Sequence, residues 1–163
     1  MKKIILGTLL ITLLPLISHG AGYVLGNFGI GGKVHDPSYG LEMGGIFLSP
    51  YHPNGGAFSI GLGASIAQTD ENPPSDPQRK YNDGTEQEIY GTFGAEIVPA
   101  FFGVAGVGYA SQEVVKPGPS GRDSETETNV ALILGMRYVV SGFNMGVGFD
   151  TRRGVTASLG VAF

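Results

Sequence analysis

The sequence predicts an all-β fold, an eight-stranded antiparallel up-and-down transmembrane β-barrel. Apolar residues alternate with small or polar residues at a period of two along most of the chain, which places the two sets on opposite faces of β-strands. Each alternating segment holds about 9 to 11 residues, the length that a tilted strand needs to cross the hydrocarbon layer of a membrane. The connections are alternately long and short, which is typical of a barrel with loops at one end and tight turns at the other.

The first residues have the three regions of a secretory signal peptide. Lys2 and Lys3 precede an apolar run over residues 4–17, and the small-residue stretch 18–21 follows. The apolar run is shorter than the roughly 20 residues of a membrane-spanning helix, which argues against the alternative of an N-terminal anchor. We therefore expect residues 1–20 to be a cleaved signal peptide and residues 21–163 to form one barrel domain.

The amino-acid composition excludes several kinds of site and ligand. The chain has no cysteine, which excludes disulfides, thiolate metal sites and the lipid-modified cysteine of a lipoprotein. Without Lys2 and Lys3, eight cationic residues remain against 14 acidic ones, a net charge of −6, so the chain is a poor binder of nucleic acid. The 28 glycines follow no collagen-like triplet and lie within the apolar stretches instead.

Seven of the eight expected strands have a readable register, with large apolar side chains on one face and mostly Gly, Ser, Thr and Ala on the other. The apolar faces are, in chain order, Val24, Phe28 and Ile30; Leu41, Met43 and Phe47; Phe58, Ile60, Leu62, Ala64 and Ile66; Ile89, Phe93, Ala95 and Ile97; Val130, Leu132, Leu134, Met136 and Tyr138; Phe143, Met145, Val147 and Phe149; and Val155, Ala157, Leu159, Val161 and Phe163. The polar residues 151–154 link the last two strands as a hairpin.

The fifth expected strand, residues 101–113, has apolar residues at both parities. Alternation alone therefore leaves its register open. We favour the register that turns Phe101, Ala105, Val107 and Tyr109 outwards.

The residues of the second face decide between a barrel and a soluble β-sandwich. A sandwich buries a bulky apolar face, whereas the small second face here suits the cramped interior of a narrow closed barrel. Longer polar connections are expected at residues 35–38, 69–85 and 115–125, and tight turns at 50–55, 98–100 and 139–142. Aromatic residues near the turn end would form a membrane-interface girdle: Tyr23, Tyr51, Phe58, Tyr138, Phe143 and Phe163.

The last strand, residues 155–163, alternates without interruption and ends on Phe163. Together with the signal peptide and the eight alternating segments, it resembles the family of small bacterial outer-membrane barrels that includes the transmembrane domain of OmpA and the opacity and adhesin proteins. The resemblance covers residues 21–163 and is one of architecture. It implies the bacterial outer membrane as the location, outer-membrane lipid as the surroundings, and recognition of Phe163 by the barrel-assembly machinery.

Six charged residues fall on the face that the barrel would enclose: Lys33, Glu42, Glu88, Glu96, Arg137 and Asp150. Charges removed from bulk water are costly unless they pair, so we interpret these residues as an internal network of salt bridges that plugs the lumen. Strand direction puts Lys33 and Glu42 near the loop end, and Glu96 and Arg137 near the turn end. The alternative is a narrow path for small solutes, although eight strands leave little more room than side chains fill.

Cations on the expected outer rim are candidates for contact with the phosphates of lipopolysaccharide: Arg79, Lys80, Arg122, Arg152 and Arg153. The acidic residues expected beside them in the external loops, Asp70, Glu71, Asp76, Asp83 and Glu86, have no calcium-loop spacing. No metal or cofactor is therefore expected. A solvated surface without a partner is the alternative.

Residues 21–163 contain two histidines, His35 and His52, and neither has neighbours at a spacing that would converge into a nucleophile, base and acid. No catalytic residue and no enzyme activity is therefore expected. The leading hypothesis is an integral outer-membrane barrel that acts as a structural or surface-interaction protein through its external loops, with an unidentified extracellular ligand. A narrow channel is the second hypothesis, and a lipid-modifying enzyme of the outer membrane is the third.

Overall fold

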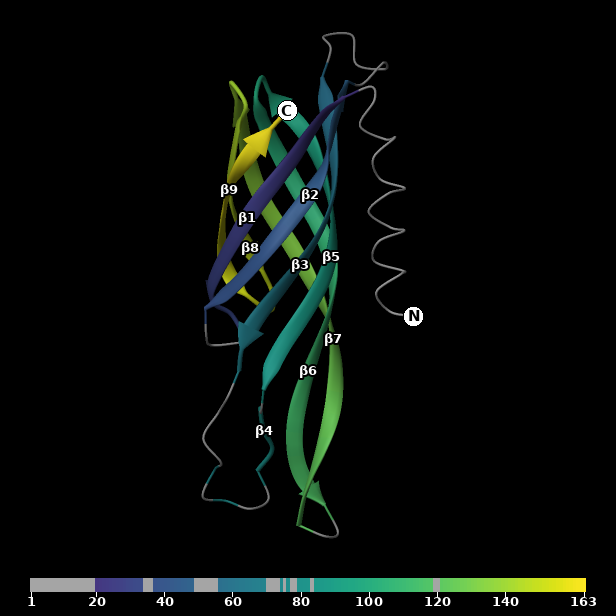
Figure 1. Cartoon of the computed structure of the whole chain (residues 1–163), viewed down its shortest axis with the longest axis vertical. Helices are drawn as coiled ribbons and strands as arrows, with labels where there is room; N and C mark the ends of the chain where they lie inside the picture. The colour runs from purple at the N-terminus through teal and green to yellow at the C-terminus, as the bar shows by residue number, and fades with distance from the viewer. Residues whose placement is uncertain are drawn as a thin grey trace.

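The alternating segments pair edge to edge in the computed structural model of the chain, and the resulting sheet closes on itself (Figure 1). The structure describes residues 20–33, 37–48, 56–69, 74, 76, 79–82, 84–118 and 121–163. In this part of the chain, no helix is long and apolar enough to cross a membrane. Apart from Gly20, the expected signal peptide lies outside the described residues.

Nine antiparallel strands run through the described residues. They are β1 (Ala21–Gly31), β2 (Ser38–Leu48), β3 (Ala57–Gln68), β4 (Tyr81–Asn82), β5 (Thr85–Val98), β6 (Phe101–Gly118), β7 (Gly121–Val140), β8 (Phe143–Asp150) and β9 (Gly154–Ala162). The short β4 adds to β6, and the other eight strands form the barrel wall, which β1 and β9 close by pairing with each other. The predicted eight-stranded antiparallel up-and-down barrel is confirmed.

The two ends of the barrel are built differently. We call the end at which β1 finishes and β9 begins the loop end, and the opposite end, at which β1 begins and β9 finishes, the turn end (Figure 1). At the turn end, Ser141 and Gly142 connect β7 to β8 with φ values of 47° and 84°, the two positive φ values that a type I′ hairpin turn requires. Phe163 exchanges two backbone hydrogen bonds with Gly22, at 2.7 and 2.8 Å, and so secures the β1–β9 seam.

The outer wall of the barrel is apolar. Large apolar side chains from all eight wall strands are exposed on it. On β6, Phe101, Val107 and Tyr109 are exposed while Phe102 and Val104 are buried, so the favoured register of this strand is confirmed. A soluble monomer rarely exposes a continuous apolar surface of this extent, whereas a wall that faces lipid requires one.

Aromatic rings gather on the wall near the turn end. Phe47 and Phe58 stack with their centres 5.3 Å apart, and Phe101 and Tyr138 lie 4.5 Å apart. Tyr23 was also expected in this girdle, and that expectation is wrong. Its side chain is only 1% exposed and points into the barrel, because its sequence neighbour Val24 faces outwards and side chains alternate along a strand.

Inward-facing glycines make room for the large side chains of the lumen. A methyl group at Gly63 would lie 2.5 Å from the Tyr90 hydroxyl, and one at Gly61 would lie 2.5 Å from Glu42 Oε1 and 2.6 Å from Thr92 Oγ1. Carbon atoms cannot approach so closely without displacing the neighbour. The small residues of the second face are therefore the space that the lumen side chains fill.

The strands β6 and β7 are the longest of the wall, with 18 and 20 residues against 14 in β5 and eight in β8. Their pairing continues without a break from Phe101 opposite Tyr138 to Gly118 opposite Gly121. The expected polar loop over residues 115–125 is therefore wrong, because its described residues, 115–118 and 121–125, extend the two strands beyond the wall (Figure 1). We call residues 111–118 of β6 and 121–129 of β7 the hairpin extension.

Candidate functional site

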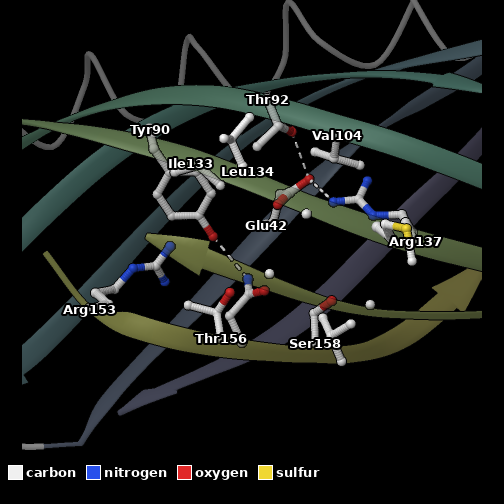
Figure 2. Close-up of a pocket in the computed structure, with 16 residues that line it drawn as sticks. Glu42, Tyr90, Thr92, Val104, Ile133, Leu134, Arg137, Arg153, Thr156 and Ser158 are labelled. Atoms are coloured by element: carbon white, nitrogen blue, oxygen red, sulfur yellow. Dashed lines mark hydrogen bonds and ion pairs between the residues drawn. The ribbon is translucent and has the colours of Figure 1, made fainter. Parts of the chain in front are cut away.

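The lumen is crossed by a cluster centred on the Glu42 carboxylate of β2 (Figure 2). Glu42 Oε1 accepts hydrogen bonds from the Tyr23 hydroxyl at 2.7 Å and from the Thr92 hydroxyl at 2.9 Å, and it pairs with Arg137 Nη2 at 2.7 Å. The Arg137 guanidinium lies over the Tyr23 ring, 4.7 Å from its centre. Four strands, β1, β2, β5 and β7, are thus joined at one carboxylate.

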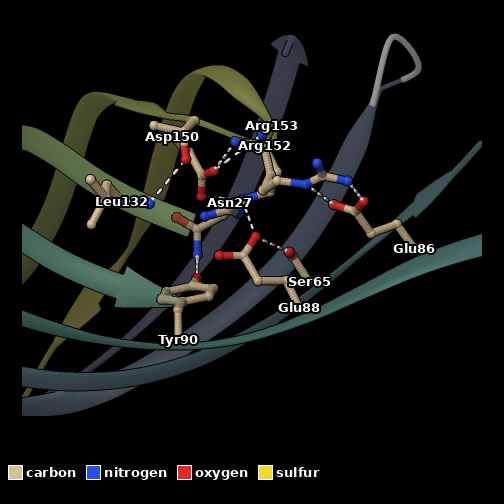
Figure 3. A network of polar contacts seen from close by, with 10 residues as sticks. Asn27, Ser65, Glu86, Glu88, Tyr90, Leu132, Asp150, Arg152 and Arg153 are labelled. Carbon is tan, nitrogen blue, oxygen red and sulfur yellow. Dashed lines mark hydrogen bonds and ion pairs between the residues drawn. The ribbon is translucent and has the colours of Figure 1, made fainter. Parts of the chain in front are cut away.

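A second cluster is centred on Arg153, in the turn between β8 and β9 (Figure 3). Arg153 Nε lies 2.9 Å from Asp150 Oδ2 and 3.2 Å from Glu88 Oε2. The Arg153 guanidinium also lies 4.8 Å from the centre of the Tyr90 ring, and the Tyr90 hydroxyl accepts a hydrogen bond from Asn27 at 2.9 Å. This cluster joins the β8–β9 turn to β5 and, through Tyr90, to β1.

Asp150 folds the β8–β9 turn into the mouth of the barrel. Its Oδ1 accepts hydrogen bonds from the backbone N–H groups of Arg152 at 2.7 Å and Arg153 at 3.1 Å. Arg152 pairs with Glu86 of β5 through Nε, at 3.2 Å, and Nη2, and it donates to Gln112 of β6 at 3.0 Å. Since both arginines are buried, the turn closes the loop end of the lumen on this side.

The prediction that Arg152 and Arg153 lie on the outer rim is therefore wrong. The strand β8 stops at Asp150 and β9 starts at Gly154, so the turn between them lies level with the inward-facing carboxylates of β5, which attract both guanidinium groups. Glu86 was expected in an external loop and is also inside the lumen, because it shares the inward parity of Glu88, two residues further on.

Four of the six charged residues expected in the lumen lie there: Glu42, Glu88, Arg137 and Asp150. The other two, Lys33 and Glu96, lie at the two ends of the barrel and form no ion pair with the described residues. Lys33 is exposed in the turn after β1, beyond the last inward position of that strand. Glu96 lies at the turn end, where its carboxylate accepts the backbone N–H groups of Ala57 at 2.9 Å and Ala100 at 2.8 Å. It holds two strand connections in place, while Arg137 reaches Glu42 instead.

Several lumen residues were missed by sequence analysis, for two different reasons. Tyr23, Glu86 and Thr92 share the parity of neighbouring inward residues, so strict counting along each strand would have found them. Arg152 and Arg153 have no such signal, because they lie in a turn whose position depends on where β8 ends relative to β5.

The lumen clusters are nearly balanced in charge. Four carboxylates (Glu42, Glu86, Glu88 and Asp150) face three guanidinium groups (Arg137, Arg152 and Arg153). A cavity of about 40 Å³ lies between the first two clusters, lined in part by Asn27, Thr156 and Ser158, with room for a few water molecules (Figure 2). Nη1 of Arg137 and of Arg153 is buried without a hydrogen-bond partner among the described residues. An ion passing through would have to break these buried ion pairs.

The hairpin extension has ion pairs of its own. Lys116 Nζ lies 2.8 Å from both Glu125 and Glu127, and Lys80 Nζ lies 3.2 Å from Glu127. The hydrogen bonds from Lys116 and Lys80 hold the pKa of Glu127 below its ordinary value, and those to Glu125 and Glu127 raise the pKa of Lys116. Beneath these charges, β4 pairs with Val114 and Val115, both of which are buried.

The remaining candidate residues are divided between the surface and the undescribed part of the chain. Arg79 and Lys80 are exposed. The Arg122 side chain and both histidines, His35 and His52, lie outside what the structure describes. Within the described residues, no group of three or more His, Asp or Glu side chains could hold a metal ion.

No protein-family model and no curated protein matches the chain. Among solved structures, it is similar to the N-terminal β-barrel domain of Pseudomonas aeruginosa OprF, with 13% sequence identity and a TM-score of 0.55 over 89% of this chain and 98% of that one. It is more weakly similar to Ail, the attachment invasion locus protein of Yersinia pestis, with 12% identity and a TM-score of 0.43 over 88% of this chain and 96% of that one.

At such low identity the likeness to the OprF domain concerns the fold alone. It agrees with the closed sheet of this chain, in which β1 pairs with β9. The chain has the fold of the small eight-stranded outer-membrane β-barrels, with an OmpA-like architecture.

Proposed function

We propose that the protein is an integral outer-membrane barrel that acts at the cell surface, with the sealed barrel as its anchor and the hairpin extension as its interacting element. The observation that supports this best is the contrast between the two parts. Ion pairs fill the lumen, whereas β6 and β7 continue as a paired hairpin beyond the wall. An anchor needs a stable closed wall, and an interacting element needs to project from it.

The apolar band indicates how far the hairpin extension projects. On β7 the outward-facing apolar residues run from Val130 to Tyr138, and residues 121–129 precede them. At about 3.3 Å per residue, these nine residues reach roughly 30 Å along the strand beyond the band. In outer-membrane barrels the longer connections face the exterior, so the loop end and the hairpin extension would lie outside the cell.

A narrow channel is less well supported by the same lumen. Arg137 and Arg153 each pair with carboxylates of other strands or turns, and Arg152 closes the mouth against Glu86. Ions could pass only if these pairs opened together. Conductance is therefore the property that separates the two hypotheses most directly.

Lipopolysaccharide is a second proposed partner, with fewer candidate cationic residues than the sequence suggested. Arg79 and Lys80 are exposed at the loop end, where lipid phosphates would lie, although Lys80 also pairs with Glu127. Arg152 and Arg153 are excluded from this role because their guanidinium groups are buried and paired. Recognition of Phe163 by the barrel-assembly machinery is likewise proposed, because its exposed ring lies beside the strand seam that closes the barrel.

The experiment compares intact bacteria that display the whole chain with bacteria that display a trimmed variant. Residues 113–126 are replaced by Asn-Gly, which joins the directly opposed Gln112 and Glu127 by a two-residue turn. We expect both proteins to show the heat-dependent shift in gel mobility of a folded barrel, and only the whole chain to promote adhesion to cultured host cells. A variant shortened within residues 70–78 is the matched control.

Two outcomes would contradict the proposal. Adhesion that survives in the trimmed variant would remove the hairpin extension as the interacting element. Steady ion conductance of the wild-type chain in planar bilayers would show that the lumen is open and would favour the channel. If the lumen is sealed as we propose, the double variant Arg137→Ala, Arg153→Ala conducts while the wild-type chain does not.

A further inference from the structure

The outer half of β7 has an edge with no partner strand. β6 pairs with β7 along its whole length, but β8 pairs only with Ile133–Val140. Just beyond this point, Leu132 directs both backbone groups towards the β8 side. Its N–H donates to Thr151 Oγ1 at 3.0 Å, and its carbonyl oxygen accepts from the Thr151 N–H at 3.1 Å.

The backbone groups of the residues that follow towards the tip can be placed from Leu132. In an antiparallel strand the bonding direction alternates from residue to residue, and the β6–β7 register has no bulge. The residues of the same parity therefore present their N–H and C=O groups to the β8 side: Ser124, Thr126, Thr128 and Val130. Among the residues that the structure describes, no strand pairs with these groups, so the edge offers a continuous row of donors and acceptors.

The side chains beside this edge indicate what it accepts. One face of β7 carries Asp123, Glu125 and Glu127, while the other carries Thr126, Thr128 and Val130. Lys116 and Lys80 pair with Glu125 and Glu127 from the β6 side, and Asp123 has no cationic partner in the described part of the chain. A strand added to the edge would therefore meet acidic groups on one face and β-branched side chains on the other.

We propose that this edge binds an extended, positively charged segment of a partner protein by strand addition. The inference rests on the proposed surface-interaction function and names the mode and chemistry of the contact. Backbone hydrogen bonds to Ser124, Thr126 and Thr128 supply the pairing, and lysine or arginine side chains opposite Asp123 and Glu125 select the partner.

A second copy of the chain fits the edge poorly. Antiparallel pairing of two β7 edges about Thr126 would place Glu125 of one copy opposite Glu127 of the other, and parallel pairing would place identical acidic residues side by side. Like charges directly opposite each other destabilise a strand pair. The acidic face thus discourages pairing between copies and favours a basic partner.

The test measures binding of a defined peptide to the refolded full-length mature chain in detergent micelles. The probe is a fluorescent eight-residue peptide in which lysine alternates with threonine or valine. Its controls are the same peptide with alternate backbone nitrogens methylated, which removes donors but keeps the charge, and the same peptide with glutamate in place of lysine. We expect a Kd of about 1–100 μM for the first peptide and about tenfold weaker binding for each control.

The protein offers a matched pair of edge variants. The N–H of Thr126 points to the free edge, so Thr126→Pro removes a donor there without removing a β6–β7 hydrogen bond, and an edge strand tolerates proline at such a position. Thr126→Ala changes the side chain and keeps the donor. We expect Thr126→Pro to weaken peptide binding about tenfold and Thr126→Ala to leave it within about twofold. Bound peptide should also slow amide hydrogen exchange at Ser124, Thr126 and Thr128.

Each alternative has its own result. Strand addition would be overturned if the methylated peptide bound as tightly as the unmodified one, or if Thr126→Pro bound the peptide as tightly as the wild-type chain does, because the contact would then rest on charge attraction alone. The comparison of the two peptides decides this even if the proline variant does not fold. Dimerisation that is lost in Thr126→Pro would overturn the choice of partner. If the trimmed variant loses adhesion but the peptide does not bind, strand addition is wrong and the surface function stands. If the peptide binds but the trimmed variant keeps its adhesion, only the surface function is wrong.

Discussion

Arg137 and Glu42 lie 95 residues apart in the sequence and 2.7 Å apart in the lumen, where they link β7 to β2 across the barrel. The strands β2 and β7 are not neighbours in the sheet. The contact therefore fixes the cross-section of the barrel in a way that strand pairing alone does not. Tyr23 and Thr92 complete the donor set around the same carboxylate.

Removing the cation of this pair should be costly. Arg137→Met leaves Glu42 buried without its partner, and such a loss lowers the free energy of unfolding by about 3–5 kcal/mol. The double variant Glu42→Gln, Arg137→Met should recover much of that loss, because no isolated charge remains. Urea unfolding in detergent micelles measures both, with Lys33→Met at an exposed position as the control. A double variant no more stable than Arg137→Met would show that the two residues are not coupled.

Crowding in the lumen predicts a contrast between two glycines of the wall. Gly61→Ala would push a methyl group into Glu42 and Thr92 and should destabilise the barrel by about 1–3 kcal/mol. Gly26→Ala adds a methyl group on the outer face, where the nearest atom is the Leu159 carbonyl oxygen at 3.7 Å, and should have little effect. Unfolding midpoints of the two variants measure this contrast. An equal loss of stability in both variants would mean that the lumen is not close-packed.

The hairpin extension should loosen in acid. The pKa of Glu127 is held below its ordinary value of 4.5 by hydrogen bonds from Lys116 and Lys80, so its stabilising contribution is complete above about pH 4.5 and is lost as the pH falls through the lowered pKa. We expect a roughly two- to fivefold increase in the opening of residues 121–129 across that range, which is the scale of exposed ion pairs. Amide exchange, corrected for its intrinsic pH dependence, measures this. Glu127→Gln should abolish the step, and a step that persists in this variant would assign it to another group.

Phe163 should matter for assembly more than for stability. Phe163 is exposed on the outer wall, and its backbone makes the bonds to Gly22 that close the seam. Phe163→Ala keeps those bonds and should refold in detergent as the wild-type chain does, while less of it reaches the outer membrane of living cells. Phe143→Ala removes another exposed ring near the turn end and is the control. Equal cellular yields of the two variants would argue against recognition of Phe163.

Which segments form strands, and which of their side chains face outwards, could be predicted because both depend on the local sequence pattern. An apolar wall in lipid requires alternation in every spanning segment, so Val130, Leu132 and Leu134 identify one strand without reference to any other. The same reasoning located Glu42 and Arg137 in the lumen from parity alone. It could not pair them, because which inward residues meet depends on the stagger of strands around the barrel.

What the sequence by itself determined is the number of spanning strands, their outward faces and the small-residue interior, since these follow from period-two alternation and from the need to pack side chains in a narrow tube. What only the tertiary structure decided is how far each strand continues and what meets across the lumen. Arg152 and Arg153 lie inside because β8 ends at Asp150, and residues 121–130 form an ordered edge because β6 pairs with them. Both outcomes arise from relations between strands, which a pattern read along one strand does not contain.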